Sequence, residues 1–312
     1  MYNKNFLIAG GSGLVGANLT KRLSSLGVNF LSTFFSYKPN FLIEKYRCFD
    51  FTKSEDCLEA TRYMDYVILC AGKTSGIGGR NSKHIIDNLK ININLLEACY
   101  INKVEKVIFI SSSTVYQQAN YPICEDELDL NKPPYDCYRD VGWLNRYVEQ
   151  LCKYYFKDHG MKIGIVRPTN LYGPYDKFDD ERSHILPALI KRALRKENPF
   201  VVWGDGEVIR DFVYVHDFID DLFGIFEKKC DCDPINIGSN KATTVKAAAN
   251  IILNLCGHDS VTPQFDLSKP TAIPYRMLNV DKLAMTFGNR KRTSLEEGLS
   301  KTIRWYEHLP NS

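Results

Sequence analysis

The sequence predicts an α/β protein with a parallel β-sheet covered by helices on both faces. Short apolar runs alternate along the chain with longer segments whose apolar residues recur at helical spacing. A glycine-rich turn joins the first apolar run to the first amphipathic segment. The 312 residues suffice for one large α/β unit and a smaller partner. Strands that alternate with helices pair in parallel, so we expect a doubly wound sheet.

The glycine-rich turn lies within Phe6–Leu19, FLIAGGSGLVGANL. Gly10 permits the tight turn, Gly13 lets the backbone approach a pyrophosphate, and Gly16 lets the helix pack closely on the strand. The N–H groups at the start of the helix then face the phosphates. The spacing predicts a Rossmann-type dinucleotide site formed by the residues of the turn, which are Gly10, Gly11, Ser12, Gly13, Leu14, Val15 and Gly16.

The end of the second predicted strand, Val28–Phe35, bears on the choice of cofactor. NAD-preferring sites often place an acid there to hold the ribose 2′-hydroxyl. Residues 32–38 read STFFSYK and contain no acid, so a 2′-phosphate is tolerated and Ser36 or Lys38 is available to bind it. The sequence therefore favours NADP(H), with NAD(H) as the alternative. Lys38 as a solvated loop charge is the plainer interpretation.

Two further strands are predicted at Tyr46–Phe51 and Tyr66–Ala71, and the second is followed by the glycine-rich segment 72–79. The carboxyl ends of parallel strands share the ligand-binding edge of such a sheet. Asp50 is suited to accept a hydrogen bond from the adenine amino group. We expect the cofactor to contact residues at these two ends, namely Asp50, Phe51, Ala71, Gly72 and Lys73.

The alternation continues to about residue 171 and then loosens. The predicted elements up to that point are a helix at His84–Tyr100, a strand at Val107–Ile110, a helix at Val141–Asp158 and a strand at Lys162–Arg167. Later elements are predicted at Ile185–Lys196, Phe200–Trp203, Asp211–Val215, Pro234–Ile237, Val245–Leu255 and Leu295–Tyr306. We expect a dinucleotide-binding domain over 1–171 and a smaller α/β substrate-binding domain over 172–212 and 238–312, with 213–237 partly returning to the first.

Composition excludes several classes of function. A formal net charge of +3 gives no reason to expect nucleic acid as a partner. No apolar run reaches the ~18 residues that a membrane helix needs. The ten cysteines are mostly scattered singly and none has zinc-site spacing, so we expect buried free thiols in a reducing cytoplasm and no metal.

Several separate segments carry a family resemblance, in order along the whole chain. They are PTNLYGP at 168–174, SHILPAL at 183–189, VWGDG at 202–206, RDF at 210–212 and SKP at 268–270. With the glycine turn, they resemble the extended short-chain dehydrogenase/reductases, the superfamily of nucleotide-sugar epimerases, dehydratases and ketoreductases. The GDP-L-fucose synthases are the group within it that these segments resemble most.

The resemblance implies hydride transfer at a sugar carbon, assisted by a Ser or Thr, a Tyr and a Lys. It maps Ser112 onto the serine that hydrogen-bonds the sugar oxygen. Thr114 falls where the fucose synthases have a cysteine that moves protons, and Tyr175 falls on its histidine partner. Threonine and tyrosine are poor bases at neutral pH, so the 3,5-epimerisation is predicted to be absent. No Asp-Glu pair follows Thr114, which disfavours a dehydratase.

The Tyr-x-x-x-Lys motif of the superfamily is not intact. Without gaps, the alignment places Val141 at the tyrosine and Asn145 at the lysine. Tyr138 lies one turn earlier and reaches the same site if the helix begins early, although a packing tyrosine is an equal alternative. Asn145 retains the capacity to hydrogen-bond the ribose, but it has no charge. The resemblance also implies cofactor contacts from Ser111, Pro168, Asn170 and Leu171.

On the substrate side, Arg210 and Arg276 match positions that hold the pyrophosphate of a nucleotide sugar, because guanidinium groups suit phosphate oxygens. A surface ion pair is the alternative for either arginine. His184 and Trp203 are expected to line the sugar and the base, together with Tyr175 and Asn170. Homologous helices form a dimer interface in this superfamily, so the resemblance implies a homodimer through 84–100 and 141–158.

Three functions stay open from the sequence. The first is an NADP(H)-dependent reductase of a nucleotide-linked 4-keto-6-deoxy sugar, acting through Ser112 and Tyr138. The second is a 4-epimerase with a tightly held NAD. The third is a nucleotide-sugar-binding relative that has the fold but no turnover, which the residues at 142 and 145 favour.

Overall fold

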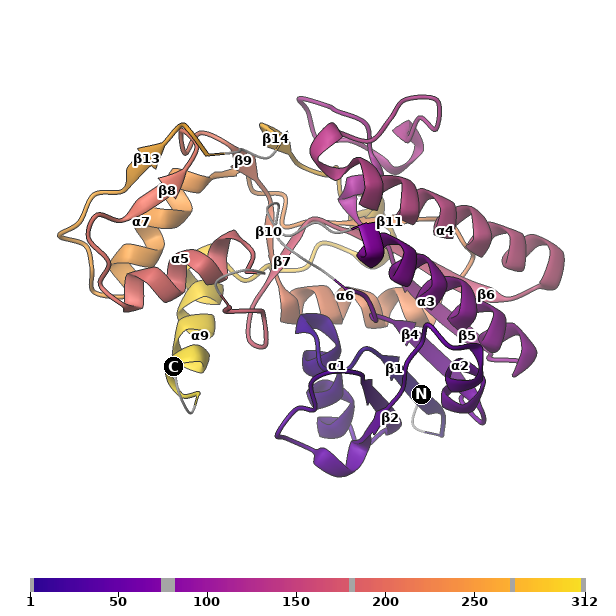
Figure 1. Ribbon diagram of the computed structural model, residues 1–312. Coiled ribbons are helices and arrows are strands. Elements are labelled where there is room, and N and C mark those ends of the chain that lie inside the picture. Colours follow the sequence, from indigo (N-terminus) through magenta and orange to yellow (C-terminus); the bar gives the residue numbers. More distant parts are fainter. Residues whose placement is uncertain (1–2, 74–81, 180–182, 270–272, 310–312) are drawn as a thin grey trace.

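The computed structural model describes residues 3–73, 82–179, 183–269 and 273–309. Most of the predicted glycine-rich segment 72–79 therefore lies outside the described residues. Figure 1 shows the two parts of the chain, with the large sheet and its helices on the right and a smaller group of helices and short strands on the left. No described helix is both long enough and apolar enough to cross a membrane.

The large part is built on a seven-stranded sheet in the order β11-β6-β5-β4-β1-β2-β3, and every strand pair in it is parallel. Its first six strands have the 3-2-1-4-5-6 order of a dinucleotide-binding sheet. The strands are β1 Asn5–Ala9, β2 Asn29–Phe34, β3 Tyr46–Cys48, β4 Tyr66–Leu69, β5 Lys106–Ile110, β6 Lys162–Pro168 and β11 Ile235–Ile237. The predicted Rossmann α/β fold is confirmed.

Helices cover both faces of this sheet. One face buries a cluster shared with α2 (Ser54–Thr61), α3 (Ser82–Ile101) and α4 (Arg139–His159). The opposite face packs on α1 (Leu14–Ser25), α6 (Val215–Lys228) and α8 (Asp281–Phe287). Successive strand residues alternate between the two clusters, as the pleat of a two-sided sheet requires. The apolar runs of the sequence are continuous for this reason.

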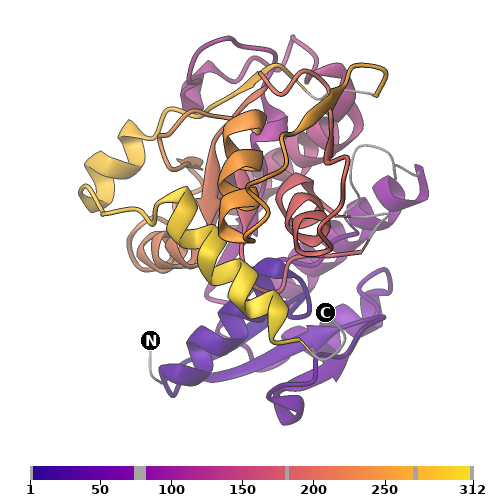
Figure 2. The same ribbon diagram turned by 90° about the vertical axis from the view of Figure 1, so that its left-hand side faces the viewer.

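The smaller part has its own apolar cluster, formed by α5 (Ile185–Leu194), α7 (Val245–Leu255), α9 (Leu295–Glu307) and short strands. Figure 2 faces these helices. The short strands are β7 Asn170–Tyr172, β8 Val201–Trp203, β9 Ile209–Arg210, β10 Phe212–Tyr214, β12 Thr243–Thr244, β13 Gln264–Asp266 and β14 Tyr275–Arg276. The predicted division into two domains at residue 171 stays a prediction.

The structure differs from the predicted elements at several points, of which the third strand, α2 and the start of α4 are examples. The third strand ends at Cys48 and not at Phe51, because the chain turns where the Asp56 carboxylate accepts the Asp50 N–H at 2.6 Å. Helix α2 follows this turn and was not predicted, since its eight residues are too few for a clear periodic pattern. Helix α4 begins at Arg139, two residues before the predicted start, after a 3₁₀ turn at Asp136–Tyr138.

Candidate active site

The glycine turn between β1 and α1 has the geometry that a dinucleotide requires. Gly10 has φ +96°, and a Cβ there would lie 2.6 Å from the backbone of Ala71, just beyond the end of β4. A Cβ on Gly16 would lie 2.1 Å from the carbonyl oxygen of Gly10. Gly13 differs, because a Cβ there would meet a single atom, at 3.8 Å. The first and third glycines are thus dictated by packing, whereas the space beside the second is open for a ligand.

The N-terminus of α1 is also free to bind an anion. Gly13 is its N-cap and supplies no side-chain hydrogen bond to the first turn, so the first N–H groups have no side-chain partner from the cap. Ser12, Leu14 and Val15 follow the path of the turn and are partly exposed. Gly11 is buried against Ser32 of β2. These residues fit the pyrophosphate of a nicotinamide dinucleotide.

The end of β2 carries the residues predicted for the 2′-phosphate. Ser36 and Lys38 are both exposed, and the Lys38 ammonium lies 5.9 Å from the centre of the Phe34 ring. Asp50 folds into its own turn, where one carboxylate oxygen accepts hydrogen bonds from the N–H and hydroxyl of Thr52. Phe51 is buried behind it. Ser36 and Lys38 are therefore accessible to a 2′-phosphate. Asp50, the residue predicted to bind adenine, already uses one carboxylate oxygen for hydrogen bonds to Thr52.

The end of β4 is held by α3. The Asn88 side chain accepts from the Lys73 N–H at 2.7 Å and donates to the Lys73 carbonyl at 3.0 Å. The Lys73 ammonium pairs with Asp87 at 2.5 Å. Ala71 and Gly72 therefore leave the sheet along a fixed path beside Gly10. Asn88 and Asp87 were not predicted, and their spacing on α3 gave no signal for this role.

The end of β5 carries Ser111, Ser112 and Thr114. The Ser112 hydroxyl accepts the Thr114 N–H at 3.2 Å and so caps the 3₁₀ turn Ser113–Val115. The hydroxyls of Ser113 and Thr114 are buried and have no hydrogen-bond partner within the protein. A buried hydroxyl without a partner is costly, so these two groups indicate where a polar ligand binds.

A buried ion pair lies beneath this turn. Glu149 of α4 and Arg167 of β6 form a bidentate contact, with distances of 2.6 and 2.9 Å. The Ser111 hydroxyl donates to Glu149 at 2.6 Å. Although burial opposes its charge, the hydrogen bond to Glu149 holds the pKa of Arg167 above its usual value. The pair joins β5, β6 and α4 directly behind Ser112.

The same network extends through Arg167 to Tyr116. Arg167 donates to the Tyr116 hydroxyl at 2.7 Å, which in turn donates to the Asn236 side chain of β11 at 2.7 Å. Burial raises the pKa of Tyr116. Tyr116 therefore stays a neutral structural phenol. Sequence reasoning missed Glu149, Arg167 and Asn236 as parts of the site, because a charged residue within a helix or strand pattern does not reveal a distant partner.

The start of α4 differs from the superfamily pattern. Gly142 is tightly packed, since a Cβ there would lie 2.5 Å from both the Thr114 carbonyl oxygen and Pro134. Asn145 is buried and Val141 is partly exposed. Tyr138 ends the 3₁₀ turn immediately before the helix. Packing of α4 against the turn that contains Thr114 requires glycine at position 142. The glycine is therefore explained by packing and is not in itself a sign that catalysis has been lost.

Arg210 and Arg276 are brought together by strand pairing. β9 and β14 run parallel with Arg276 directly opposite Arg210. Burial, reinforced by the neighbouring Arg276, lowers the pKa of Arg210 to about 10. The guanidinium of Arg210 hydrogen-bonds Tyr138, and that of Arg276 lies 3.9 Å from the centre of the Tyr138 ring. Like charges in register destabilise a sheet, so this pair indicates an anion site.

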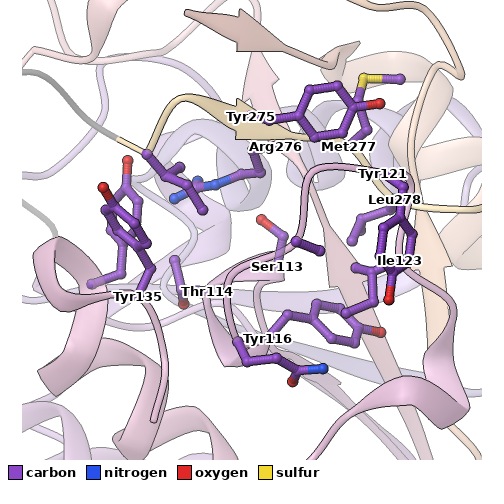
Figure 3. A pocket seen from close by; sticks show the side chains of 14 residues that line it. Ser113, Thr114, Tyr116, Tyr121, Ile123, Tyr135, Tyr275, Arg276, Met277 and Leu278 are labelled. Carbon is purple, nitrogen blue, oxygen red and sulfur yellow. The ribbon is translucent and has the colours of Figure 1, made fainter. Parts of the chain in front are cut away.

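One pocket joins Tyr138 and Arg276 to the hydroxyls of Ser113 and Thr114, and Ser112 and Arg210 are not among its lining residues. Figure 3 shows Ser113 and Thr114 on one side of it and β14, with Tyr275 and Arg276, on the other. Its described lining has no Asp, Glu, His, Lys or Cys side chain. The lining residues are Ser113, Thr114, Tyr116, Gln117, Ala119, Tyr121, Ile123, Tyr135, Tyr138, Ile273, Tyr275, Arg276, Met277 and Leu278. The pocket offers hydroxyls and one guanidinium but no strong base.

Tyr175 lies elsewhere, in an aromatic cluster between the two parts of the chain. Its ring centre is 5.0 Å from that of Phe41 and 4.9 Å from that of Trp305, and the Lys21 ammonium lies 5.1 Å from it. Its φ of +69° is unusual for a bulky residue. It does not line the pocket that contains Thr114.

The remaining predicted residues are dispersed around the site. His184 is half exposed and lies 3.5 Å from Asp176, and Trp203 is 53% exposed with the Lys269 ammonium 5.8 Å from its ring. Asn170 donates to the Asp211 carbonyl at 3.0 Å. Pro168 is the last residue of β6. Leu171 packs against the apolar cluster between the sheet and helices α1, α6 and α8. Their roles toward cofactor and substrate stay predictions.

Comparison with known proteins identifies the family. Residues 6–238 match the model of the NAD dependent epimerase/dehydratase family. The chain belongs to this family. It is 31% identical to the probable GDP-L-fucose synthase 1 of Oryza sativa subsp. japonica, over 96% of this chain and 90% of that protein. It is 30% identical to the GDP-L-fucose synthase of Escherichia coli K12, over 98% and 97%.

Solved structures agree with this assignment. The UDP-glucose 4-epimerase of Thermotoga maritima, solved with UDP-glucose, superposes with a TM-score of 0.87 at 25% identity, covering 97% of this chain and 98% of that one. A GDP-L-fucose synthetase of Naegleria fowleri bound to NADP gives a TM-score of 0.84 at 24% identity, covering 98% and 95%. The predicted kinship with nucleotide-sugar epimerases and fucose synthases is confirmed. Together with the fit of the glycine turn, membership in an NAD dependent family indicates a nicotinamide cofactor.

Proposed function

We propose that this protein is an NADP(H)-dependent reductase of a nucleotide-linked 4-keto-6-deoxy sugar. As a family member, it is an enzyme of the nucleotide-sugar oxidoreductase and epimerase type. The observation that carries the finer proposal is the pocket at the end of β5, where the described lining combines hydroxyls with Arg276 and has no side chain suited to abstract a carbon-bound proton.

The diphosphate of the substrate is assigned to the arginine pair. Two guanidinium groups in register need a ligand of at least two negative charges, and a diphosphate supplies them with paired oxygens. The Nη2 atom of Arg276 is buried and has no partner within the protein. Trp203, exposed on β8, is assigned to stacking on the base, and His184, the N-cap of α5, is assigned to the sugar or the base. The GDP sugars named for the relatives make guanine the first base to test.

The sugar oxygen is assigned to the turn at the end of β5. A bound nicotinamide supplies the hydride. Ser112 and Thr114 hydrogen-bond the oxygen on which negative charge develops, and the Glu149–Arg167 pair holds their turn in place. Gly10 to Gly16 bind the pyrophosphate of the cofactor. Ser36 and Lys38 are assigned to its 2′-phosphate, since no acid opposes that phosphate in residues 32–38.

The proposal excludes 3,5-epimerisation. That reaction requires bases on the faces of the sugar ring, and a thiol and an imidazole are replaced here by Thr114 and Tyr175. Thr114 lines the pocket, but Tyr175 is held between Phe41 and Trp305. Neither residue type is ionised as a base at neutral pH.

The test is NADPH consumption by the purified protein with a panel of GDP- and dTDP-linked 4-keto-6-deoxy sugars. We expect consumption with at least one, and a product that carries deuterium at C4 alone when C4-deuterated NADPH is the reductant. In deuterated water, C3 and C5 of the product should acquire no deuterium. No consumption with any member of the panel contradicts the proposal.

A 4-epimerase is the second candidate, favoured by the likeness to the UDP-glucose 4-epimerase of T. maritima. Such an enzyme retains its oxidised cofactor through the cycle. Mass spectrometry of the dinucleotide released on denaturation separates the two functions, because stoichiometric NAD supports the epimerase and its absence, with NADPH binding, supports the reductase.

Binding without turnover is the third candidate, favoured by Val141 and Asn145 in the positions of the superfamily's Tyr and Lys. The double variant Val141→Tyr/Asn145→Lys tests it. If the native site is inactive for lack of these side chains, the double variant gains turnover. An active wild-type protein refutes this candidate directly.

The homodimer is proposed through α3 and α4. Large apolar side chains are exposed on these helices, with exposures of 39% for Tyr100, 43% for Trp143, 52% for Tyr147 and 48% for Tyr154. Adjacent exposed aromatic residues on two packed helices mark an interaction face. Trp143→Glu/Tyr147→Glu should yield a monomer in sedimentation equilibrium. A monomeric wild-type protein contradicts the proposal of a homodimer.

The cytoplasmic location expected from the sequence stays a prediction.

A further inference from the structure

Tyr138 is the sequence-predicted proton donor, but its contacts lie with the two arginines. Its ring centre is 3.9 Å from the guanidinium carbon of Arg276, and its hydroxyl hydrogen-bonds Arg210. A separation of 3.9 Å places the planar guanidinium against a ring, as in cation–π stacking. One side chain thus contacts both cations of the proposed diphosphate site.

We propose that Tyr138 is a positioning residue of the diphosphate site, which holds the guanidinium of Arg276 by its ring and that of Arg210 by its hydroxyl so that both converge on one diphosphate. This inference rests on the proposed function, because it assumes that the arginine pair binds the diphosphate.

The need for such a residue follows from the strand register. Arg210 and Arg276 lie directly opposite each other in β9 and β14. Their like charges repel, and Arg276 is only partly buried, so repulsion favours rotamers in which it turns away into solvent. The Tyr138 ring offers Arg276 a favourable position close to Arg210. It thereby lowers the cost of assembling the site before a ligand arrives.

The contact geometry leaves the ligand-binding edge of Arg276 available. A ring stacked on a guanidinium occupies its face, whereas phosphate oxygens bind in its plane. The Nη2 atom of Arg276 is buried and has no partner within the protein. Arg210 uses one nitrogen to donate to the Ile209 carbonyl at 2.7 Å, and this bond fixes the rest of its fork.

Tyr138 itself is held firmly in place. Its N–H donates to the Tyr135 carbonyl at 2.7 Å, which closes the 3₁₀ turn before α4. The first turn of α4 is locked by Gly142, whose Cα packs against Pro134 and the Thr114 carbonyl. The tyrosine is therefore set by the same packing that places the hydroxyls at the end of β5, and it links the diphosphate site to the sugar site.

The test measures binding of inorganic pyrophosphate and of GDP by calorimetry, without any reaction. Tyr138→Phe keeps the ring on Arg276 but loses the hydroxyl contact, so affinity for both probes should fall about 3- to 10-fold. Tyr138→Ala loses both contacts and should lower affinity about 30-fold or more. Thermal melting of the variants without ligand checks that each is folded, and Tyr138→Phe carries the test if Tyr138→Ala is not.

A double-variant cycle separates positioning from general structural support. In the Arg210→Met background, the Tyr138 hydroxyl has no guanidinium to hold, so adding Tyr138→Phe should change pyrophosphate affinity by less than about 2-fold. Tyr63→Phe is the matched control. Its side chain is 84% exposed and does not line the pocket, so loss of its hydroxyl should leave pyrophosphate binding unchanged.

Each outcome decides a different point. Wild-type affinity in Tyr138→Phe with a loss of kcat of about 100-fold or more would make Tyr138 the proton donor and overturn the inference. Wild-type affinity and wild-type kcat would also overturn it. Failure of the wild-type protein to bind either pyrophosphate or GDP would refute the diphosphate site itself, and with it the proposed function.

Discussion

The glycine turn after β1 and the first turn of α4 face the same site but carry different kinds of constraint. In the glycine turn, Gly10 and Gly16 cannot hold a side chain, because a Cβ at either position would overlap backbone atoms. At the start of α4, Gly142 is fixed in this way, whereas Val141 and Asn145 stand where the resemblance places the tyrosine and the lysine of the superfamily. Packing therefore dictates glycine at positions 10, 16 and 142.

The largest effect is expected from Gly16→Ala. Its Cβ would lie 2.1 Å from the Gly10 carbonyl oxygen, a backbone atom that cannot turn aside as the end of a flexible side chain can. We expect a destabilisation on the order of 5 kcal/mol, comparable to the whole stability of many domains. Gly13→Ala is the matched control, because a Cβ there meets its nearest atom at 3.8 Å.

Thermal melting and NADPH binding separate these two glycines. Gly16→Ala should be insoluble or melt far below the wild type. Gly13→Ala should melt normally and bind NADPH more weakly, because its methyl group enters the open space assigned to the pyrophosphate. Equal melting temperatures for the two variants would refute the distinction between packing and binding glycines.

The next largest effect concerns the deeper part of α4, where Glu149 pairs with the buried Arg167. Glu149→Gln leaves the Arg167 charge buried without a counter-ion, so we expect a loss of about 3 kcal/mol in the free energy of unfolding. Urea denaturation measures it. The exposed Lys301–Glu297 pair provides the control, since Glu297→Gln removes a solvent-screened charge and should change the free energy of unfolding much less. Equal costs for the two variants would show that the buried pair does not anchor α4.

The same two regions explain what the sequence could predict. The glycine spacing predicted the turn, and the alternation of apolar runs predicted the Rossmann sheet, because both patterns are local. Glu149, Arg167 and Asn236 escaped prediction, since their contacts join α4, β6 and β11 across distant parts of the chain. Arg210 and Arg276 were predicted singly by resemblance. Their direct opposition depends on the register of β9 and β14, two strands of two residues each that no sequence pattern marks.

A smaller effect is expected from Arg276→Met, which should raise the stability of the ligand-free protein and lower its affinity for pyrophosphate. Removing one of two like charges in register should leave the ligand-free protein at least as stable as the wild type, with a gain of about 0.5 kcal/mol. Pyrophosphate affinity should fall by about 2 kcal/mol of binding free energy, since a charged hydrogen-bond partner is lost. Melting with and without pyrophosphate measures both. A destabilised ligand-free variant would show that Arg276 is a structural residue.

The smallest effect is expected at the end of β2, where cofactor choice depends on exposed groups. Lys38→Ala should weaken NADPH binding about 3- to 10-fold and leave NADH binding unchanged, because only NADPH presents a 2′-phosphate to the ammonium. Lys53→Ala is the control, since it removes an equally exposed charge at the N-cap of α2. The effect at Lys38 should shrink at high salt. Two results would contradict a contact between Lys38 and the 2′-phosphate. One is an equal loss of affinity for NADPH and NADH in Lys38→Ala, and the other is the same loss of NADPH affinity in Lys53→Ala. Either would mean that the overall electrostatic field of the protein sets the preference for NADPH. Since the glycine turn binds a pyrophosphate that both cofactors share, this contact at Lys38 is where the two cofactors become distinguishable.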